Sequence, residues 1–171
     1  SRIGYAQVKS FTSRTPQELR QAFDGLLALE IEALILDLRN NAGGLLQEAI
    51  ETADAILDEG VIVIEKTRDG EREYTAKEGG LDRELPLIVL VNQGTASAAE
   101  LVAGALRDNG RAVLIGQRTY GKGSVQLIFP LSDGSSVHIT SAEWLTPSRA
   151  PLNRQGLEPD ISMIPAEDGR D

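Results

Sequence analysis

The sequence predicts an α/β domain in which helices flank a mixed sheet, and three observations carry that prediction. Two continuous aliphatic runs, at 33–39 and 86–92, are typical of strands buried on both faces. Segments with the apolar spacing of a helix, at 15–30 and 45–60, alternate with these runs. Two strand pairs joined by short polar turns then add hairpins to the sheet. We expect a single domain over 1–171, long enough to bury roughly 68–70% of its unfolded surface.

The first strand and the first helix follow from local patterns. Residues 3–8 alternate weakly in polarity, which indicates an opening strand. Thr15 and Glu18 have the spacing of a capping box, and Pro16 occupies the first helical position. The helix is therefore predicted to begin at this point and to run to residue 30.

The second helix and the first hairpin lie on either side of a glycine. After the break at 40–44, the helix is predicted to end at Gly60. Asp69-Gly70 is the strongest hairpin signal in the chain, because this pair favours a tight turn between strands. The strands that it joins are predicted at 61–67 and 72–77.

The second half of the chain contributes one more helix and three more strands. These are predicted at 97–110 for the helix and at 112–116, 124–131 and 135–144 for the strands. The last two strands form a hairpin around Ser132-Asp133-Gly134. From Pro147 the chain is predicted to be a loop, and residues 165–171 are expected to form a disordered tail.

Composition excludes several classes of function. The net charge of −9 disfavours binding to nucleic acid or to an anionic membrane, since both attract lysine and arginine. The sequence has no cysteine and one histidine, which rules out disulfides, thiolate metal sites and multi-histidine metal sites. No apolar run approaches the ~18 residues needed to cross a bilayer. The chain starts without Met on a strand-like segment, so we expect the core of a longer protein.

The segment GQRTYGKGS, at 116–124, nearly matches a phosphate-binding loop. Gly116, Gly121 and Lys122 fit the pattern, but Gly123 stands where Ser or Thr would hold Mg²⁺. The residues after Lys122 read as a strand, whereas a phosphate-binding loop leads into a helix. A nucleotide site is therefore disfavoured, and Lys122 is either a solvated loop lysine or a functional group of another kind.

Ser97 lies between a buried strand and a helix, where two interpretations stay open. In the first, Ser97 and Glu100 form a capping box at the start of the helix. In the second, the turn presents the Ser97 hydroxyl as a nucleophile in the crevice where α/β proteins bind ligands. The amide of Ala98 and the helix dipole would then stabilise an oxyanion.

A serine nucleophile needs a base, and the sequence offers two. His138 lies in an alternating strand and is better read as a half-exposed strand residue. Lys122 could act as the base in a Ser-Lys pair. The lysine amine would then need a pKa of about 7–8 instead of ~10.4, which requires burial in the catalytic state. Gly43 and Gly44 could supply an oxyanion amide from a neighbouring loop, or could serve only a tight turn.

Three blocks of the sequence carry a resemblance to a known family. LDLRNNAGGLL, VLVNQGTASAAELVAGAL and GQRTYGKGSVQ resemble, in this order, the signature blocks of the C-terminal processing peptidases, also called tail-specific proteases. The resemblance extends from IGYAQVKSF to GLEPDI, which is nearly the whole chain. It implies a fold related to the crotonase and Clp-peptidase cores and the activity of a serine peptidase.

The same resemblance assigns roles to individual residues. Ser97 would be the nucleophile and Lys122 the general base, with Gln126 positioning the lysine. The backbone amides of Gly43 and Ala98 would form the oxyanion hole. In a straight strand residues 122 and 126 lie ~13 Å apart, so a contact between them requires a bend at the glycines.

Further properties are implied by the resemblance alone. Glu100 matches an acidic position near the site, although we interpret it as helix-capping. NAGG and TASAAE replace the commoner NPGG and TASASE and leave the dyad intact. Family members usually carry a PDZ domain, and this chain begins after the place where that domain would end.

The function implied is an endopeptidase that cleaves near the C-termini of proteins through an acyl-enzyme, without metal or cofactor. Its partners would be protein or peptide substrates bound by their C-terminal tails. Its location would be extracytoplasmic, in the periplasm or the thylakoid lumen. The alternatives are a non-catalytic binding module on the same core and a crotonase-like acyl-CoA enzyme.

Overall fold

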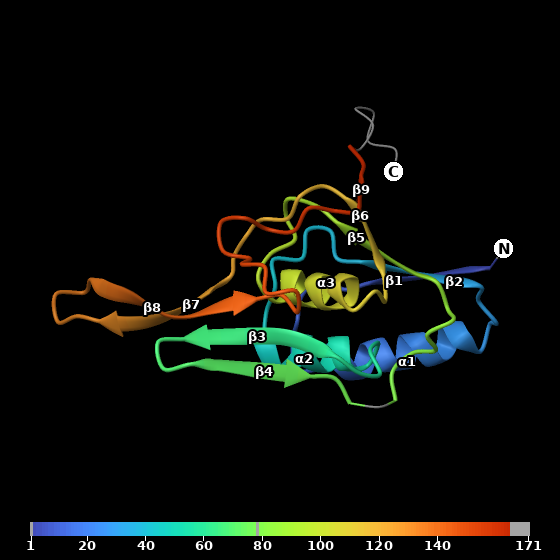
Figure 1. Ribbon diagram of the computed structural model, residues 1–171, viewed down its shortest axis with the longest axis horizontal. Coiled ribbons are helices and arrows are strands. Elements are labelled where there is room, and N and C mark those ends of the chain that lie inside the picture. The colour runs from blue at the N-terminus through green and yellow to red at the C-terminus, as the bar shows by residue number, and fades with distance from the viewer. Residues whose placement is uncertain (1, 78, 165–171) are drawn as a thin grey trace.

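The computed structural model describes residues 2–77 and 79–164, and within them the strands divide between two sheets (Figure 1). The first sheet is parallel, with the strand order β1-β2-β5-β6-β9. Its strands are β1 (Ile3–Gln7), β2 (Ala33–Asp37), β5 (Leu87–Val91), β6 (Val113–Gly116) and β9 (Ile161–Ser162). The aliphatic strands β2 and β5 pair at its centre, as their unbroken hydrophobicity predicts.

The second sheet is antiparallel, with the order β4-β3-β8-β7. It is built from two hairpins, whose strands are β3 (Val61–Thr67), β4 (Glu71–Thr75), β7 (Ser124–Pro130) and β8 (Ser136–Leu145). Both predicted hairpins are confirmed. The α/β class is confirmed as well, but the two strand directions lie in separate sheets and are not mixed in one.

Three helices accompany the sheets in the described residues: α1 (Thr15–Leu27), α2 (Leu46–Asp54) and α3 (Ala98–Asp108). Helix α3 lies between the two sheets and packs on α2, β3 and β6 (Figure 1). Its first nine residues are all buried, because small side chains allow neighbours on every side. One hydrophobic cluster joins α3 to β2 and β5, so the start of α3 is held rigidly at the end of the parallel sheet.

Three details of the first two helices differ from the prediction. Helix α1 ends at Leu27 and not at residue 30. The Thr15 hydroxyl accepts a hydrogen bond from the Thr12 amide at 2.9 Å and donates to the Ser10 carbonyl at 3.1 Å, so it forms no capping box with Glu18. Pro16 does lie in the first turn. Helix α2 ends at Asp54 and not at Gly60, because the chain turns there and buries the consecutive residues 56 and 57 in the core.

The segment after Pro147 is not wholly a loop. Strand β9 joins the edge of the parallel sheet, where the Met163 amide donates to the Gly116 carbonyl at 2.8 Å. Two residues are too few to show a strand period in the sequence. Residues 165–171, which we expect to be disordered, lie outside the described residues. Over residues 2–77 and 79–164, no helix is long and apolar enough to span a membrane.

Candidate active site

Ser97 occupies a sharp turn between β5 and α3. Its backbone φ is +56°, a left-handed value that few residues other than glycine adopt and that costs about 1–3 kcal/mol. The turn is held by Thr95, whose buried hydroxyl donates to the Leu38 carbonyl at 2.8 Å and accepts from the Asn92 amide at 3.0 Å. The half-buried Ser97 is therefore the residue before the first turn of α3, as predicted.

Glu100 ties this turn to the loop that carries Lys122. The fully buried carboxylate accepts the amide of Ser97 at 2.9 Å and the amide of Lys122 at 2.8 Å on the same oxygen. Its other oxygen accepts the Gly121 amide at 2.7 Å and the Thr119 hydroxyl. The bond to Ser97 is one half of the predicted capping box, and the other three bonds were not predicted from the sequence.

The glycine loop lies directly against Ser97, as expected. Gly43 has φ +103°, and a Cβ added there would come within 2.9 Å of the Ala96 carbonyl oxygen and of the Ser97 Cβ. The buried side chain of Asn41 organises this loop: its amide donates to the Val8 carbonyl at 2.8 Å and its oxygen accepts the Gly43 amide at 2.9 Å. Only glycine leaves room for this approach of two loops.

The two amides expected in the oxyanion hole differ in their bonding. No acceptor for the Ala98 amide is found within residues 2–77 and 79–164, so that group is available to a ligand. The Gly43 amide donates to Asn41 within its own loop. Ala98 is thus ready to donate, whereas Gly43 would have to share or exchange its partner.

Lys122 matches the solvated loop lysine of the two interpretations left open and lacks the burial that a base needs in the catalytic state. Its side chain is exposed, although its backbone is fixed by Glu100. Among the described residues the Lys122 amine makes no hydrogen bond or ion pair, with Ser97 or with any other residue. The structure brings the two residues to one end of α3 without joining their side chains.

Gln126 and His138 lie on the β7–β8 hairpin. The Gln126 amide donates to the Thr140 hydroxyl at 2.7 Å and to the Ser124 hydroxyl at 3.2 Å, so it does not bond Lys122. A bulge follows Val125, but it does not bring Gln126 to the lysine. The exposed His138 bonds Ser136 at 3.0 Å on its own strand, which gives no support to a triad.

With the fold and these loops defined, known proteins can be compared. The profile of Peptidase family S41 matches residues 2–163. The chain belongs to this family.

Relatives of this S41 chain carry names that specify C-terminal processing. It is 41% identical over 164 residues to the chloroplastic C-terminal processing peptidase of Tetradesmus obliquus, covering 95% of this chain and 35% of that protein. It is 43% identical over 158 residues to the carboxyl-terminal-processing protease of Synechocystis sp., covering 92% of this chain and 37% of that protein.

A solved structure agrees with these relatives. The photosystem II D1 C-terminal processing protease superposes with a TM-score of 0.87 at 41% identity, over 94% of this chain and 42% of that one. The fold expected from the family resemblance is confirmed. The chain spans between about a third and two fifths of the length of these proteins.

A second buried carboxylate of the S41 chain was missed in the sequence. Asp37, at the end of β2, is fully buried and bonded by the Arg39 guanidinium at 2.9 Å and the Tyr5 hydroxyl at 2.7 Å. Burial alone would raise the pKa of Asp37, but the bonds from Arg39 and Tyr5 outweigh it and hold this pKa below its ordinary value. The available signal was an acidic residue inside an otherwise aliphatic strand.

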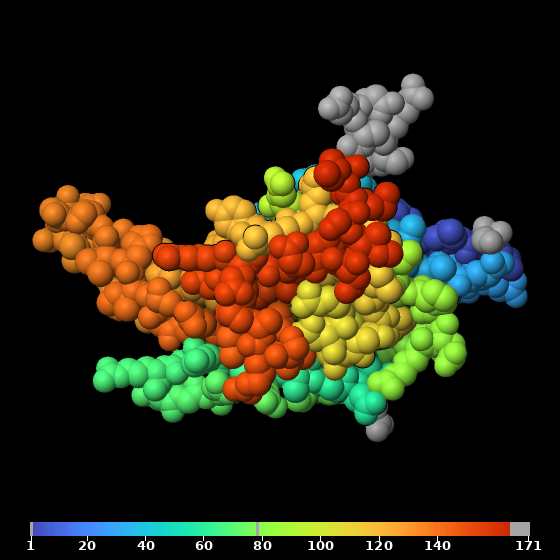
Figure 2. Space-filling model, turned by 45° about the horizontal axis from the view of Figure 1, so that its top comes forward, coloured from blue at the N-terminus to red at the C-terminus, as the bar shows by residue number. Residues whose placement is uncertain are grey.

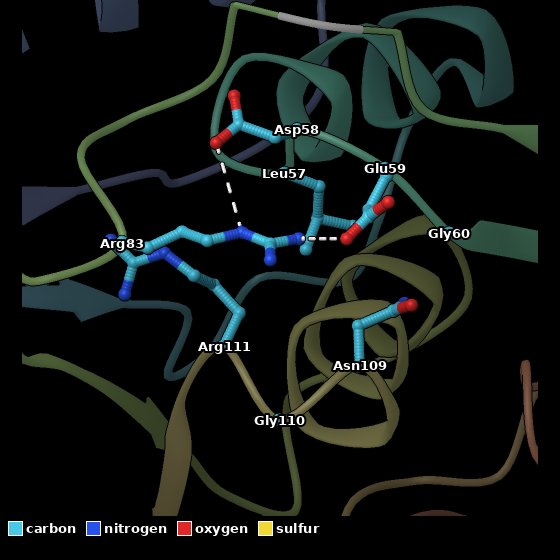
Figure 3. A pocket seen from close by; sticks show the side chains of 8 residues that line it. All are labelled: Leu57, Asp58, Glu59, Gly60, Arg83, Asn109, Gly110 and Arg111. Carbon is cyan, nitrogen blue, oxygen red and sulfur yellow. Dashed lines mark hydrogen bonds and ion pairs between the residues drawn. The ribbon is translucent and has the colours of Figure 1, made fainter.

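A cavity of about 430 Å³ lies at the opposite end of α3 (Figure 3). Its lining includes Asn109 and Arg111, and Arg83 there pairs with Glu59 at 2.8 Å and with Asp58 at 3.7 Å. The 11 residues of α3 separate it from Ser97 by roughly 16 Å along the helix axis. None of the predicted site residues lines this cavity.

Over residues 2–77 and 79–164, no cluster of three or more His, Cys, Asp or Glu could hold a metal ion.

Proposed function

We propose that this chain is the catalytic core of a serine endopeptidase that cleaves near the C-termini of proteins, with Ser97 as nucleophile and Lys122 as general base. One observation carries the proposal. A single oxygen of Glu100 accepts the backbone amides of both residues, at 2.9 and 2.8 Å, so the two side chains start from adjacent points. A buried carboxylate with four donors is a rigid support for such a pair.

The proposed reaction uses groups of this chain alone. The Ser97 hydroxyl attacks the scissile carbonyl carbon while the Lys122 amine takes its proton. The Ala98 amide, joined by that of Gly43, donates to the carbonyl oxygen as it becomes negative. Lys122 then gives the proton to the departing amine as the C–N bond breaks. Water hydrolyses the resulting ester and restores Ser97.

The exposed Lys122 side chain must be shielded from water before it can act as the base in this reaction. A lysine acts as a base only where contact with water is reduced, because water stabilises its charged form. A bound substrate, or another part of a longer protein, would have to cover the lysine. The left-handed backbone of Ser97 supports a functional role for the turn, since the capping role alone does not require such strain.

The names of the relatives support protein tails as substrates, and the chloroplastic and cyanobacterial relatives support an extracytoplasmic location. We also propose that residues 1–171 form one peptidase core domain, since the described residues share one buried cluster. A PDZ domain elsewhere in a longer protein would be a partner of this core. Gln126 would position Lys122 only after a rearrangement of its present bonds to Thr140 and Ser124.

The test is cleavage of a protein substrate by the full-length protein. Ser97→Ala and Lys122→Ala are each expected to abolish cleavage, because each removes a reacting group, while the circular dichroism spectrum stays unchanged. Lys66→Ala, which removes an exposed lysine on β3, is the matched control and is expected to keep full activity. Turnover in either active-site variant would contradict the assignment.

A non-catalytic binding module is the second candidate, favoured by the separate, exposed Lys122 side chain. Labelling of the full-length protein with a fluorophosphonate discriminates between the two. Labelling that is lost in Ser97→Ala and reduced in Lys122→Ala would support the peptidase. Tail binding without labelling would support the binding module.

A further inference from the structure

Two asparagines join the glycine loop to the turn that carries Ser97. The side-chain oxygen of Asn92 accepts the backbone amide of Asn40 at 2.9 Å, and the side-chain amide of Asn92 donates to the side-chain oxygen of Asn40 at 3.0 Å. Asn40 lies after β2 and Asn92 directly after β5. We call this exchange of two hydrogen bonds the Asn pair. Because the two bonds run side by side, they fix both the distance and the relative orientation of the two segments.

The orientation of the Asn92 side chain is set by its neighbours. Its oxygen also accepts the Gly94 amide at 3.0 Å, and an atom that receives two backbone N–H groups must be the oxygen. The NH₂ group of Asn92 therefore faces Asn40, which presents its own oxygen. A Cβ added to Gly94 would come within 2.8 Å of that oxygen, so the contact is closely packed.

The Asn pair stands at the start of the segment that presents Gly43 to Ser97. Asn40 has φ +60°, a left-handed value that asparagine adopts more readily than most residues. The chain then enters Asn41, whose carbonyl accepts the Ala96 amide at 2.9 Å and whose side chain accepts the Gly43 amide. The position of Gly43 therefore depends on how the chain is held at Asn40.

The Asn pair lies at the surface. Asn40 is exposed and Asn92 is half-buried, and Figure 2 shows the turn after β5 in light green at the outside of the molecule. Water can replace either partner of an exposed hydrogen bond, so the Asn pair contributes little to the free energy of folding. Buried bonds, such as that from the Thr95 hydroxyl to the Leu38 carbonyl, already hold the two segments together. The Asn pair adds accuracy to their relative position.

We propose that Asn40 and Asn92 are positioning residues that set the separation of the Gly43 and Ala98 amides in the oxyanion hole. This inference rests on the proposed peptidase function. An oxyanion donor acts at about 2.7–3.1 Å from the charged oxygen, so a small shift of one loop weakens its bond. Without the Asn pair the Gly43 loop moves relative to α3. The transition state then loses stabilisation, while substrate binding is retained.

The first test compares Asn40→Gly with Asn40→Asp in the full-length protein. Glycine and aspartate both tolerate the left-handed backbone, but glycine removes the side-chain oxygen that aspartate keeps. The kcat for a protein substrate is expected to fall about tenfold in Asn40→Gly, with KM changed less than about twofold. In Asn40→Asp, kcat is expected to stay within about threefold of the wild type. An unchanged kcat in Asn40→Gly, or an equal fall in both variants, would overturn the proposal.

A peptide aldehyde tests the oxyanion hole directly. Ser97 adds to the aldehyde carbon and forms a hemiacetal, whose oxygen lies where the oxyanion of the reaction would lie. The inhibition constant is expected to rise about tenfold in Asn40→Gly. In the Ser97→Ala protein, the affinity of the parent peptide is expected to be the same with and without Asn40→Gly. Equal losses for the aldehyde and the parent peptide would show a general disturbance of the site and would overturn the proposal.

A double-mutant cycle tests whether the two asparagines act through each other. Asn92→Ala alone is expected to lower kcat at least as much as Asn40→Gly, because it also removes the acceptor of the Gly94 amide. Adding Asn40→Gly to Asn92→Ala is expected to lower kcat by less than a further threefold or so. Losses that multiply would overturn the pairing, and Asn92→Ala alone still tests the proposal if Asn40→Gly does not fold.

The outcomes separate this inference from the proposed function. A full-length wild-type protein that neither cleaves nor is labelled by a fluorophosphonate would overturn both. Cleavage by the wild type together with an unchanged kcat in Asn40→Gly and in Asn92→Ala would overturn the positioning role alone and leave the peptidase intact.

Discussion

Replacing Glu100 by glutamine tests whether one carboxylate holds the Ser97 turn and the Lys122 loop together. The carboxylate accepts four hydrogen bonds, two on each oxygen, and is fully buried. Glutamine has one acceptor oxygen and one NH₂ donor in the same shape. If its oxygen keeps the amides of Ser97 and Lys122, its NH₂ faces the Gly121 amide, which loses its acceptor. The Thr119 hydroxyl can rotate to accept.

The magnitude follows from these contacts. An unpaired buried amide costs about 1–3 kcal/mol, and exchanging charged for neutral acceptors weakens each remaining bond by roughly 1 kcal/mol. Removal of a buried charge offsets part of this loss. We therefore expect Glu100→Gln to lower the free energy of unfolding by about 2–4 kcal/mol. That is a large fraction of the ~5–15 kcal/mol that stabilises a typical domain.

The assay is equilibrium unfolding in urea at neutral pH. With an m-value of about 2 kcal/mol per molar, the midpoint is expected to fall by roughly 1–2 M at constant m. Glu18→Gln is the matched control, because the Glu18 side chain is 60% exposed. It is expected to change the free energy of unfolding by less than about 0.5 kcal/mol. A Glu100→Gln midpoint equal to that of the control would refute the role of this carboxylate.

Two further predictions use other contacts. Gly43→Ala is expected to destabilise the protein by about 2–4 kcal/mol in urea unfolding and to lower cleavage, since its φ is +103° and a Cβ would contact Ser97. Gly25→Ala is the control, with no atom near its Cβ position, and is expected to be neutral or stabilising by up to about 1 kcal/mol. Burial raises the pKa of Asp108, but hydrogen bonds led by that from Ser148 outweigh it, so the folded-state pKa is lowered. The contribution of Asp108 to stability is therefore complete above the unfolded-state pKa of ~3.9. It is lost as the pH falls through the lower pKa of the folded state. The free energy of unfolding is expected to fall less steeply below about pH 4 in Asp108→Asn than in the wild type. Parallel plots of unfolding free energy against pH for the two proteins would contradict this.

Elements set by local sequence were predicted well. The Asp69-Gly70 turn joins β3 and β4 because the preferred dihedrals of these two residues depend on no distant contact. The ends of elements were predicted less well. Helix α2 stops at Asp54 because the core accepts residues 56 and 57, and β9 exists only through its bonds to the edge of the sheet.

The candidate site divides in the same way. The strand-to-helix turn at Ser97 and the glycine loop at Gly43 were placed from the sequence, since both follow buried strands of one parallel sheet. The three bonds of Glu100 to residues 119–122 were not, because they join segments about twenty residues apart. The sequence left open whether Lys122 is a solvated loop residue or a base that is buried in the catalytic state, since burial depends on every neighbour in space.

The sequence by itself determined the order of the strands and helices as far as Leu145, the family, and the small residues that allow α3 to be buried. These depend on short-range periodicity and on side-chain size, which can be read directly from the amino-acid sequence. Only the tertiary structure decided that the strands separate into two sheets and that Glu100 joins two loops. It also decided that Asn40 and Asn92 exchange hydrogen bonds. Those features are contacts between distant segments, and their free energies appear only once the chain has folded.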